Sequence, residues 1–127
     1  MKNAKIYICF LSFCLILTGC RIDATWLLET EETLMIETYQ SNGKSPAIEI
    51  RKGDEKFSQL KRWLEQNEKG WNPSPATYMP GTEVRGKKFV LNFLHSVAVL
   101  NFKSPDGKYN QYVKGIKEAE YQFLLRK

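Results

Sequence analysis

Few residues in this 127-residue chain have the chemistry that catalysis or metal binding requires. His95 is the only histidine, and it falls between two apolar runs, where we expect a solvated turn. An exposed imidazole lacks the buried carboxylate that a serine–histidine–acid triad needs. The sequence has no cluster of histidine and cysteine at metal-ligand spacing and no glycine-rich phosphate loop. We therefore predict no catalytic residue, no metal site and no cofactor.

Carboxylates are the remaining residues that could support catalysis. Glutamates crowd the segment before the first predicted strand and begin the last predicted helix, where acidic groups favour the helix dipole. Glu83 lies near Arg85 and is expected to be its surface partner. Glycoside-cleaving enzymes need two carboxylates at a fixed separation, and nothing in the spacing marks such a pair. Catalysis or small-ligand binding in a cleft near Tyr78 and Glu83 stays as a third hypothesis.

Binding to another protein is a stronger prediction, and the first candidate surface is the irregular segment from Trp71 to Gly81. Its three prolines stiffen the chain, so an aromatic contact is presented with little ordering cost. Interface hot spots are enriched in aromatic residues and arginine. The candidate contacts here are Trp71, Tyr78, Met79 and Arg85. The alternative for Trp71 is that it packs on the core below the first helix.

The second candidate surface is a band of asparagines on a sheet. If 89–94 and 97–102 pair about His95-Ser96, one face of this hairpin is wholly apolar and the other carries polar groups. If Lys103 then pairs with Lys108, one face of three strands carries Asn92, Asn101, Asn110 and Tyr112. Asparagine is unfavourable in strands, which favours a binding role. The alternative is the solvated back of an antiparallel sheet.

The first twenty residues carry an export signal. Lys2 and Lys5 precede an apolar run, Ile6 to Leu17, that is too short to span a bilayer comfortably. The run ends in Leu-Thr-Gly-Cys at 17–20. This motif resembles the lipobox of bacterial lipoproteins, in which a leucine and two small residues precede an invariant cysteine. An ordinary secretory signal with a chance cysteine is the alternative.

The resemblance implies cleavage before Cys20 and acylation of this cysteine with diacylglycerol and an amide-linked chain such as palmitate, which anchors the protein in a membrane. Arg21, in place of an aspartate that would favour retention in the inner membrane, implies the outer membrane, facing the periplasm. Removal of Cys9 and Cys14 with the signal leaves no second cysteine for a disulfide. Without the two signal lysines, the formal charge of +5 falls to +3, too mild to predict nucleic-acid binding.

Periodicity predicts the elements that position these residues. We expect a signal peptide at 1–19, a lipidated terminus and tether at 20–32, and one domain at 33–127. The alternative for the tether is that its Trp26-Leu27-Leu28 docks instead of staying free. The expected class is α+β, with about five antiparallel strands in the order β-β-α-β-β-β-α and helices on one face. The predicted strands span 33–39, 47–51, 89–94, 97–102 and a segment from 109, and the predicted helices span 54–70 and 118–124.

These features predict a small periplasm-facing lipoprotein that acts by protein binding and not as an enzyme. Its most concrete form is an inhibitor or immunity protein against an envelope-attacking enzyme or toxin. The alternative is an accessory subunit of an envelope secretion, transport or assembly complex.

Overall fold

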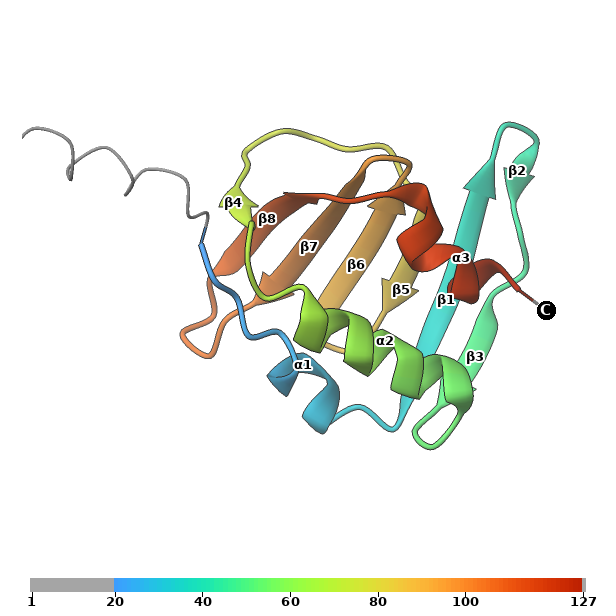
Figure 1. The fold of residues 1–127 in the computed structure, drawn as a ribbon, viewed down its shortest axis with the longest axis horizontal. Helices are drawn as coiled ribbons and strands as arrows, with labels where there is room; N and C mark the ends of the chain where they lie inside the picture. Colours follow the sequence, from blue (N-terminus) through green and yellow to red (C-terminus); the bar gives the residue numbers. More distant parts are fainter. Residues whose placement is uncertain (1–19, 127) are drawn as a thin grey trace, which may run out of the picture.

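The structure is a computed structural model that describes residues 20–126. The predicted signal peptide, with the first three lipobox residues, lies outside the described residues. The described chain is an α+β domain built on one eight-stranded, antiparallel sheet, where the sequence predicted about five strands (Figure 1). Its elements are α1 (Trp26–Glu29), β1 (Thr33–Gln40), β2 (Gly43–Lys44), β3 (Ile48–Arg51), α2 (Glu55–Gln66), β4 (Asn72–Pro73), β5 (Thr82–Arg85), β6 (Phe89–Leu94), β7 (Val97–Lys103), β8 (Tyr109–Gly115), the 3-10 helix η1 (Glu118–Tyr121) and α3 (Gln122–Leu125).

The sheet follows the order β2-β1-β5-β6-β7-β8-β4, and β3 pairs with β1 beside β2. The predicted first hairpin is present, since β1 pairs antiparallel with both β2 and β3. Sequence reasoning missed β5, a strand of four residues that inserts between β1 and β6. The two halves of the sheet are therefore joined through a strand that follows directly after the proline-rich segment.

All the helices cover one face of the sheet (Figure 1). The helix α2 buries the apolar stripe that its 3.6-residue period predicts, and it ends at Gln66 rather than at the predicted Gly70. Within residues 20–126, no helix has both the length and the apolar character needed to cross a bilayer. The covered face forms the core, and its fully buried side chains include Leu34, Leu60, Leu64, Trp71, Val84, Leu91, Phe93, Leu100 and Leu124.

The register of β6 with β7 is as predicted, with Phe89 opposite Phe102 and Leu94 opposite Val97. The predicted register of β7 with β8 is wrong by one residue, because Lys103 pairs with Tyr109. Gly107 is the cause: it has a φ of 87° and adds one residue to the turn, as in a type I turn followed by a left-handed bulge. A one-residue slip moves every side chain of β8 to the other face.

The segment 20–32, predicted as a tether, is packed on the domain. The backbone N–H of Trp71 donates to the carbonyl of Cys20 over 3.2 Å. The backbone N–H of Ile22 donates to the backbone carbonyl of Glu68 over 2.6 Å. Leu27 and Leu28 of α1 are 3% and 2% exposed, so this segment docks on the domain and is not a free tether. The domain therefore includes nearly all of the chain that follows Cys20.

Candidate binding site

The face of the sheet opposite the helices, here called the outer face, carries alternate residues of β5 to β8. The registers place Glu83 opposite Asn92, Asn92 opposite Val99, and Asn101 opposite Gln111. Residues directly opposite one another share a face of the sheet. Polar side chains from four neighbouring strands therefore gather on the outer face.

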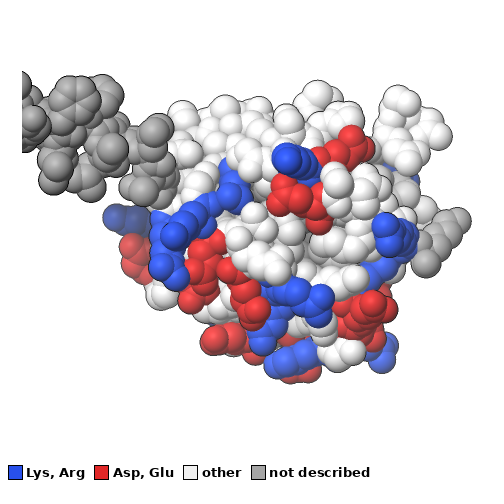
Figure 2. All heavy atoms as spheres, viewed as in Figure 1, with Lys and Arg blue, Asp and Glu red and all other residues white. Residues whose placement is uncertain are grey.

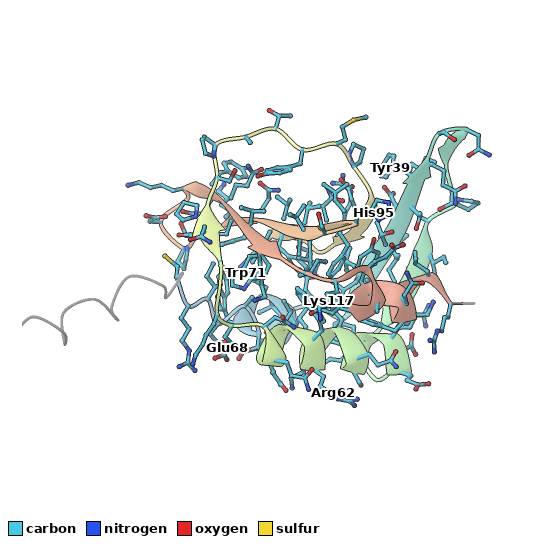
Figure 3. The ribbon with its side chains drawn as sticks, turned by 45° about the horizontal axis from the view of Figure 1, so that its top comes forward. Tyr39, Arg62, Glu68, Trp71, His95 and Lys117 are labelled. Atoms are coloured by element: carbon cyan, nitrogen blue, oxygen red, sulfur yellow. The ribbon has the colours of Figure 1, made fainter. Side chains whose placement is uncertain are left out.

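The loop at residues 74–81 lies over this face, so that the sheet is placed between the loop and α2 (Figure 3). Gln111 fastens the start of the loop: its side-chain amide donates to the carbonyls of Ser74 and Ala76 over 2.8 and 2.6 Å. The backbone N–H of Ser74 donates in turn to the carbonyl of Gln111 over 3.1 Å. One strand residue thus holds the first three residues of the loop.

Asn92 fastens the end of the loop in the same manner. Its Oδ1 accepts the N–H of Gly81 over 2.8 Å, and its Nδ2 donates to the carbonyl of Met79 over 3.0 Å. A Cβ at Gly81 would lie 2.3 Å from the carbonyl oxygen of Phe93, so only glycine allows this close approach. The loop is therefore clamped at both ends, and the clamp leaves Met79 80% exposed at the surface.

A cavity of about 420 Å³ lies between the loop and the outer face. Its floor comes from β5 to β8 and its wall from Ser74 to Tyr78. The hydroxyls of Ser74 and Tyr78 lie 2.8 Å apart and share a hydrogen bond, which orients the tyrosine along the wall. The lining is Ser74, Pro75, Ala76, Thr77, Tyr78, Glu83, Val90, Asn92, Val99, Asn101 and Gln111.

A second hollow, of about 310 Å³, adjoins the first, because Val90 and Asn101 line both. We call it the cationic hollow, and it is lined by Arg85, Gly86, Lys87, Lys88, Phe89, Val90, Asn101, Phe102, Lys103 and Tyr109. Lys103 Nζ lies 5.6 Å from the centroid of the Tyr109 ring, a cation–π arrangement. The two surfaces that the sequence treated as separate candidates thus meet in one concave region.

Two carboxylates, Glu83 in the cavity lining and Glu37 on the neighbouring strand β1, are neutralised. Glu83 accepts a 2.6 Å hydrogen bond from Arg85, and the guanidinium of Arg85 also lies 3.7 Å from Glu37. Lys44 pairs with Glu37 over 2.9 Å. The hydrogen bond from Lys44 lowers the pKa of Glu37 below 4.5, and the same bond raises the pKa of Lys44 above 10.5. This network fixes the position of Arg85 in the wall of the cationic hollow.

His95 lies at the tip between β6 and β7, as predicted, and has a left-handed backbone with a φ of 37°. Its Nδ1 is 3.2 Å from Glu118 Oε2, and the two side chains are 85% and 53% exposed. Residues 20–126 contain no group of three or more histidine, cysteine, aspartate or glutamate side chains arranged to hold a metal ion.

Three of the predicted binding residues lie elsewhere. Trp71 is fully buried, with its Nε1–H donating to the carbonyl of Asn67 over 2.6 Å and its ring edge-to-face with Trp63. Asn110 pairs with Phe102, and Tyr112 stacks on the Phe102 ring on the helix-covered side. The bulge at Gly107 explains why Asn110 and Tyr112 lie on the face opposite to the predicted one. Trp71 packs in the core, which was the alternative to a binding role.

The remaining predicted residues, Tyr78, Met79, Arg85, Asn92 and Asn101, all belong to the loop or to the outer face. Their roles differ from one another, however. Asn92 is 5% exposed, and its amide makes two hydrogen bonds to the backbone of the loop. The side chain of Asn101, in contrast, makes no hydrogen bond within residues 20–126. Sequence reasoning missed Gln111, because the expected register placed it on the wrong face.

Comparison of the sequence and the structure with protein-family models, curated proteins and solved structures finds no match. The functional argument therefore rests on the geometry of the site and on the amino-terminal motif.

Proposed function

We propose that this chain is a small, periplasm-facing lipoprotein, anchored in the outer membrane through Cys20, that acts by binding another protein and not by catalysis. Its most concrete form is an inhibitor or immunity protein that blocks an envelope-attacking enzyme or toxin. The observation that carries the proposal is the clamped loop over the outer face, which presents Met79 beside a concave, polar surface.

Rigidity makes this surface suited to binding. Two prolines, Pro75 and Pro80, and two side-chain amides restrain the loop at residues 74–81, so that little conformational entropy is lost when a partner docks. Met79, at 80% exposure, offers a flexible and polarisable thioether that adapts to an apolar pocket. A rigid base with one adaptable apolar contact lowers the cost of binding a protein partner.

The amino terminus supports the anchored part of the proposal. Cys20 is exposed and unpaired among the described residues, which leaves its sulfur accessible for acylation. The four lipobox positions support the lipid anchor. Arg21, in place of an aspartate, supports the outer membrane.

A photo-crosslinking residue placed at Met79 in living cells, with the lipid anchor intact, tests the proposal. The same residue at Leu125, another exposed apolar position at 41% exposure, is the control. We expect an envelope protein to crosslink from Met79 and not from Leu125, and the purified pair to show loss of the partner's enzymatic activity. If the two positions capture the same proteins, or none, the proposed binding surface is wrong.

One observation favours the alternative, an accessory subunit of an envelope assembly. The strand β3 lies at the edge of the sheet, with β1 as its only partner in residues 20–126, and its Ile48 is 48% exposed. An open edge can accept a strand from a larger partner. A crosslink from Ile48 to a protein that co-purifies in fixed stoichiometry, without any change in enzymatic activity, would support this alternative.

A further inference from the structure

We propose that the cationic hollow binds a carboxylate side chain of an acidic peptide segment, and that the backbone of this segment passes over Asn101 into the cavity under the loop. The inference rests on the proposed protein-binding function and adds the chemistry of the partner. Four observations carry it, namely uncompensated charge, a like-charge pair, a rigid turn and one unengaged amide.

The lysines of the cationic hollow form no ion pair within the part of the chain that the structure describes. Arg85 is neutralised by Glu83 and Glu37, but Lys87, Lys88 and Lys103 make no salt bridge within residues 20–126. All three lysines are exposed and line the same hollow. An anionic group placed there would lie among three lysine side chains.

Two of these lysines repel one another across the sheet. The N–H of Lys103 donates to the carbonyl of Lys88 over 3.1 Å, which extends the pairing of β6 with β7 by one position. Lys88 and Lys103 are therefore directly opposite on the outer face, where like charges destabilise a sheet. A bound carboxylate between them would remove this repulsion, so the arrangement is more favourable with a ligand than without one.

The turn that carries Lys87 and Lys88 is fixed in place. Glu31, which is 1% exposed, accepts the backbone N–H of Lys87 at its Oε1 over 2.6 Å. A Cβ at Gly86 would lie 2.4 Å from the Phe89 ring and 2.8 Å from Glu31 Oε1, so the turn is closely packed. Binding an anion here therefore orders only the ends of the lysine side chains.

Asn101 indicates a peptide as the source of the carboxylate. It lines both hollows, and its amide, unlike that of Asn92 or Gln111, makes no hydrogen bond within the described residues. One amide side chain offers a donor and an acceptor, which match the C=O and N–H of one peptide unit. A phosphate group, which only accepts from the protein, would leave the oxygen of this amide unused.

The test uses the lipidated protein in neutral detergent micelles and a fluorescent hexapeptide with two glutamates separated by one glycine. Its isosteric control peptide carries glutamine in place of both glutamates. We expect the acidic peptide to bind at least tenfold more tightly than the control peptide, and its affinity to fall as salt is raised. Equal affinity of the two peptides would overturn the proposal.

Matched variants locate the site. Lys88→Gln combined with Lys103→Gln is expected to lower the affinity at least tenfold. The control is Lys52→Gln combined with Lys61→Gln, because these lysines line another surface hollow, of about 340 Å³, beside α2. If the control pair weakens binding equally, the peptide is responding to net charge and the proposed site is wrong.

Asn101→Ala separates a peptide from a phosphate-bearing ligand. We expect it to weaken the acidic peptide severalfold and to leave competition by inorganic phosphate unchanged. If phosphate binds more tightly than the peptide and Asn101→Ala has no effect on either, the peptide assignment is overturned in favour of a phosphate group. A crosslink from Met79 in living cells together with failure of the acidic peptide would refute this inference and leave the proposed function standing.

Discussion

At the scale of single residues, two asparagines on one face of the sheet differ in what they do. Asn92 is buried and holds the backbone of the loop, and Asn101 is unengaged within residues 20–126. Asn92→Ala would leave the N–H of Gly81 and the carbonyl of Met79 without their partner. We expect a loss of about 1–3 kcal/mol in the free energy of unfolding, measured by urea titration.

Asn101→Ala is the control for this prediction, because it removes the same side chain from a neighbouring position without breaking a hydrogen bond. Its expected effect is within about 0.5 kcal/mol. Equal losses for the two variants would show that Asn92 does not clamp the loop.

Glu37 gives the outer face a dependence on pH. Since hydrogen bonding from Lys44 lowers its pKa in the folded state, the stabilisation is present above the unfolded value of 4.5 and is lost as the pH falls through the folded value. The pKa of Lys44 is raised, so its share is lost only as the pH rises above 10.5. Urea midpoints of Glu37→Gln and wild type should therefore differ above pH 4.5 and converge as the pH falls through the folded pKa of Glu37. Glu65→Gln, on the exposed side of α2, is the control, and an equal convergence there would contradict the assignment to Glu37.

At the scale of elements, local sequence patterns predicted several strands and one of the hairpins correctly. The prediction failed where one extra residue in a turn changes the register of the paired strands. The hairpin of β6 and β7 was predicted correctly, since only His95 and Ser96 separate two strands of clear alternation. The next hairpin was wrong because a bulge cannot be recognised from alternation alone, and that error hid Gln111. The strand β5 was missed because it has only four residues and directly follows a proline-rich segment, although a short turn at residues 86–88 pairs it with β6.

Gly107 should be the residue that sets the register of β7 and β8. At a φ of 87°, alanine is strained, and we expect Gly107→Ala to lower the free energy of unfolding by about 1–2 kcal/mol. Gly115→Ala is the control, because its Cβ would meet no atom within 4 Å and its φ lies outside the left-handed region. Nuclear Overhauser contacts between Lys103 and Tyr109 would report the register, and a variant as stable as wild type would contradict this role of Gly107.

At the scale of the whole molecule, the segment that follows Cys20 is held against the domain and forms almost no free linker. The bridge from Cys20 to Trp71 and the ion pair of Arg21 with Glu68, at 2.6 Å, fix the amino terminus at the β4 edge of the sheet. Figure 2 shows acidic and basic side chains interspersed over the helix-covered face, with no large region of one sign. If Cys20 is acylated as proposed, the position of this anchor should therefore decide how the domain sits on a membrane.

If Cys20 is acylated as proposed, the β4 end of the sheet should lie nearer to the lipid than the β3 end. The edge strands β4 and β3 are separated by six strand spacings, roughly 29 Å. A fluorophore on Lys69→Cys, two residues before Trp71, should be quenched by nitroxide-labelled lipids at least twice as strongly as one on Ile48→Cys. With Cys20 acylated as proposed, the introduced thiol is the only one to label in the mature chain. Ten glycine and serine residues inserted after Arg21 should remove the difference, because the domain would then turn freely. Equal quenching at both positions without the insertion would show that the docked terminus does not orient the domain.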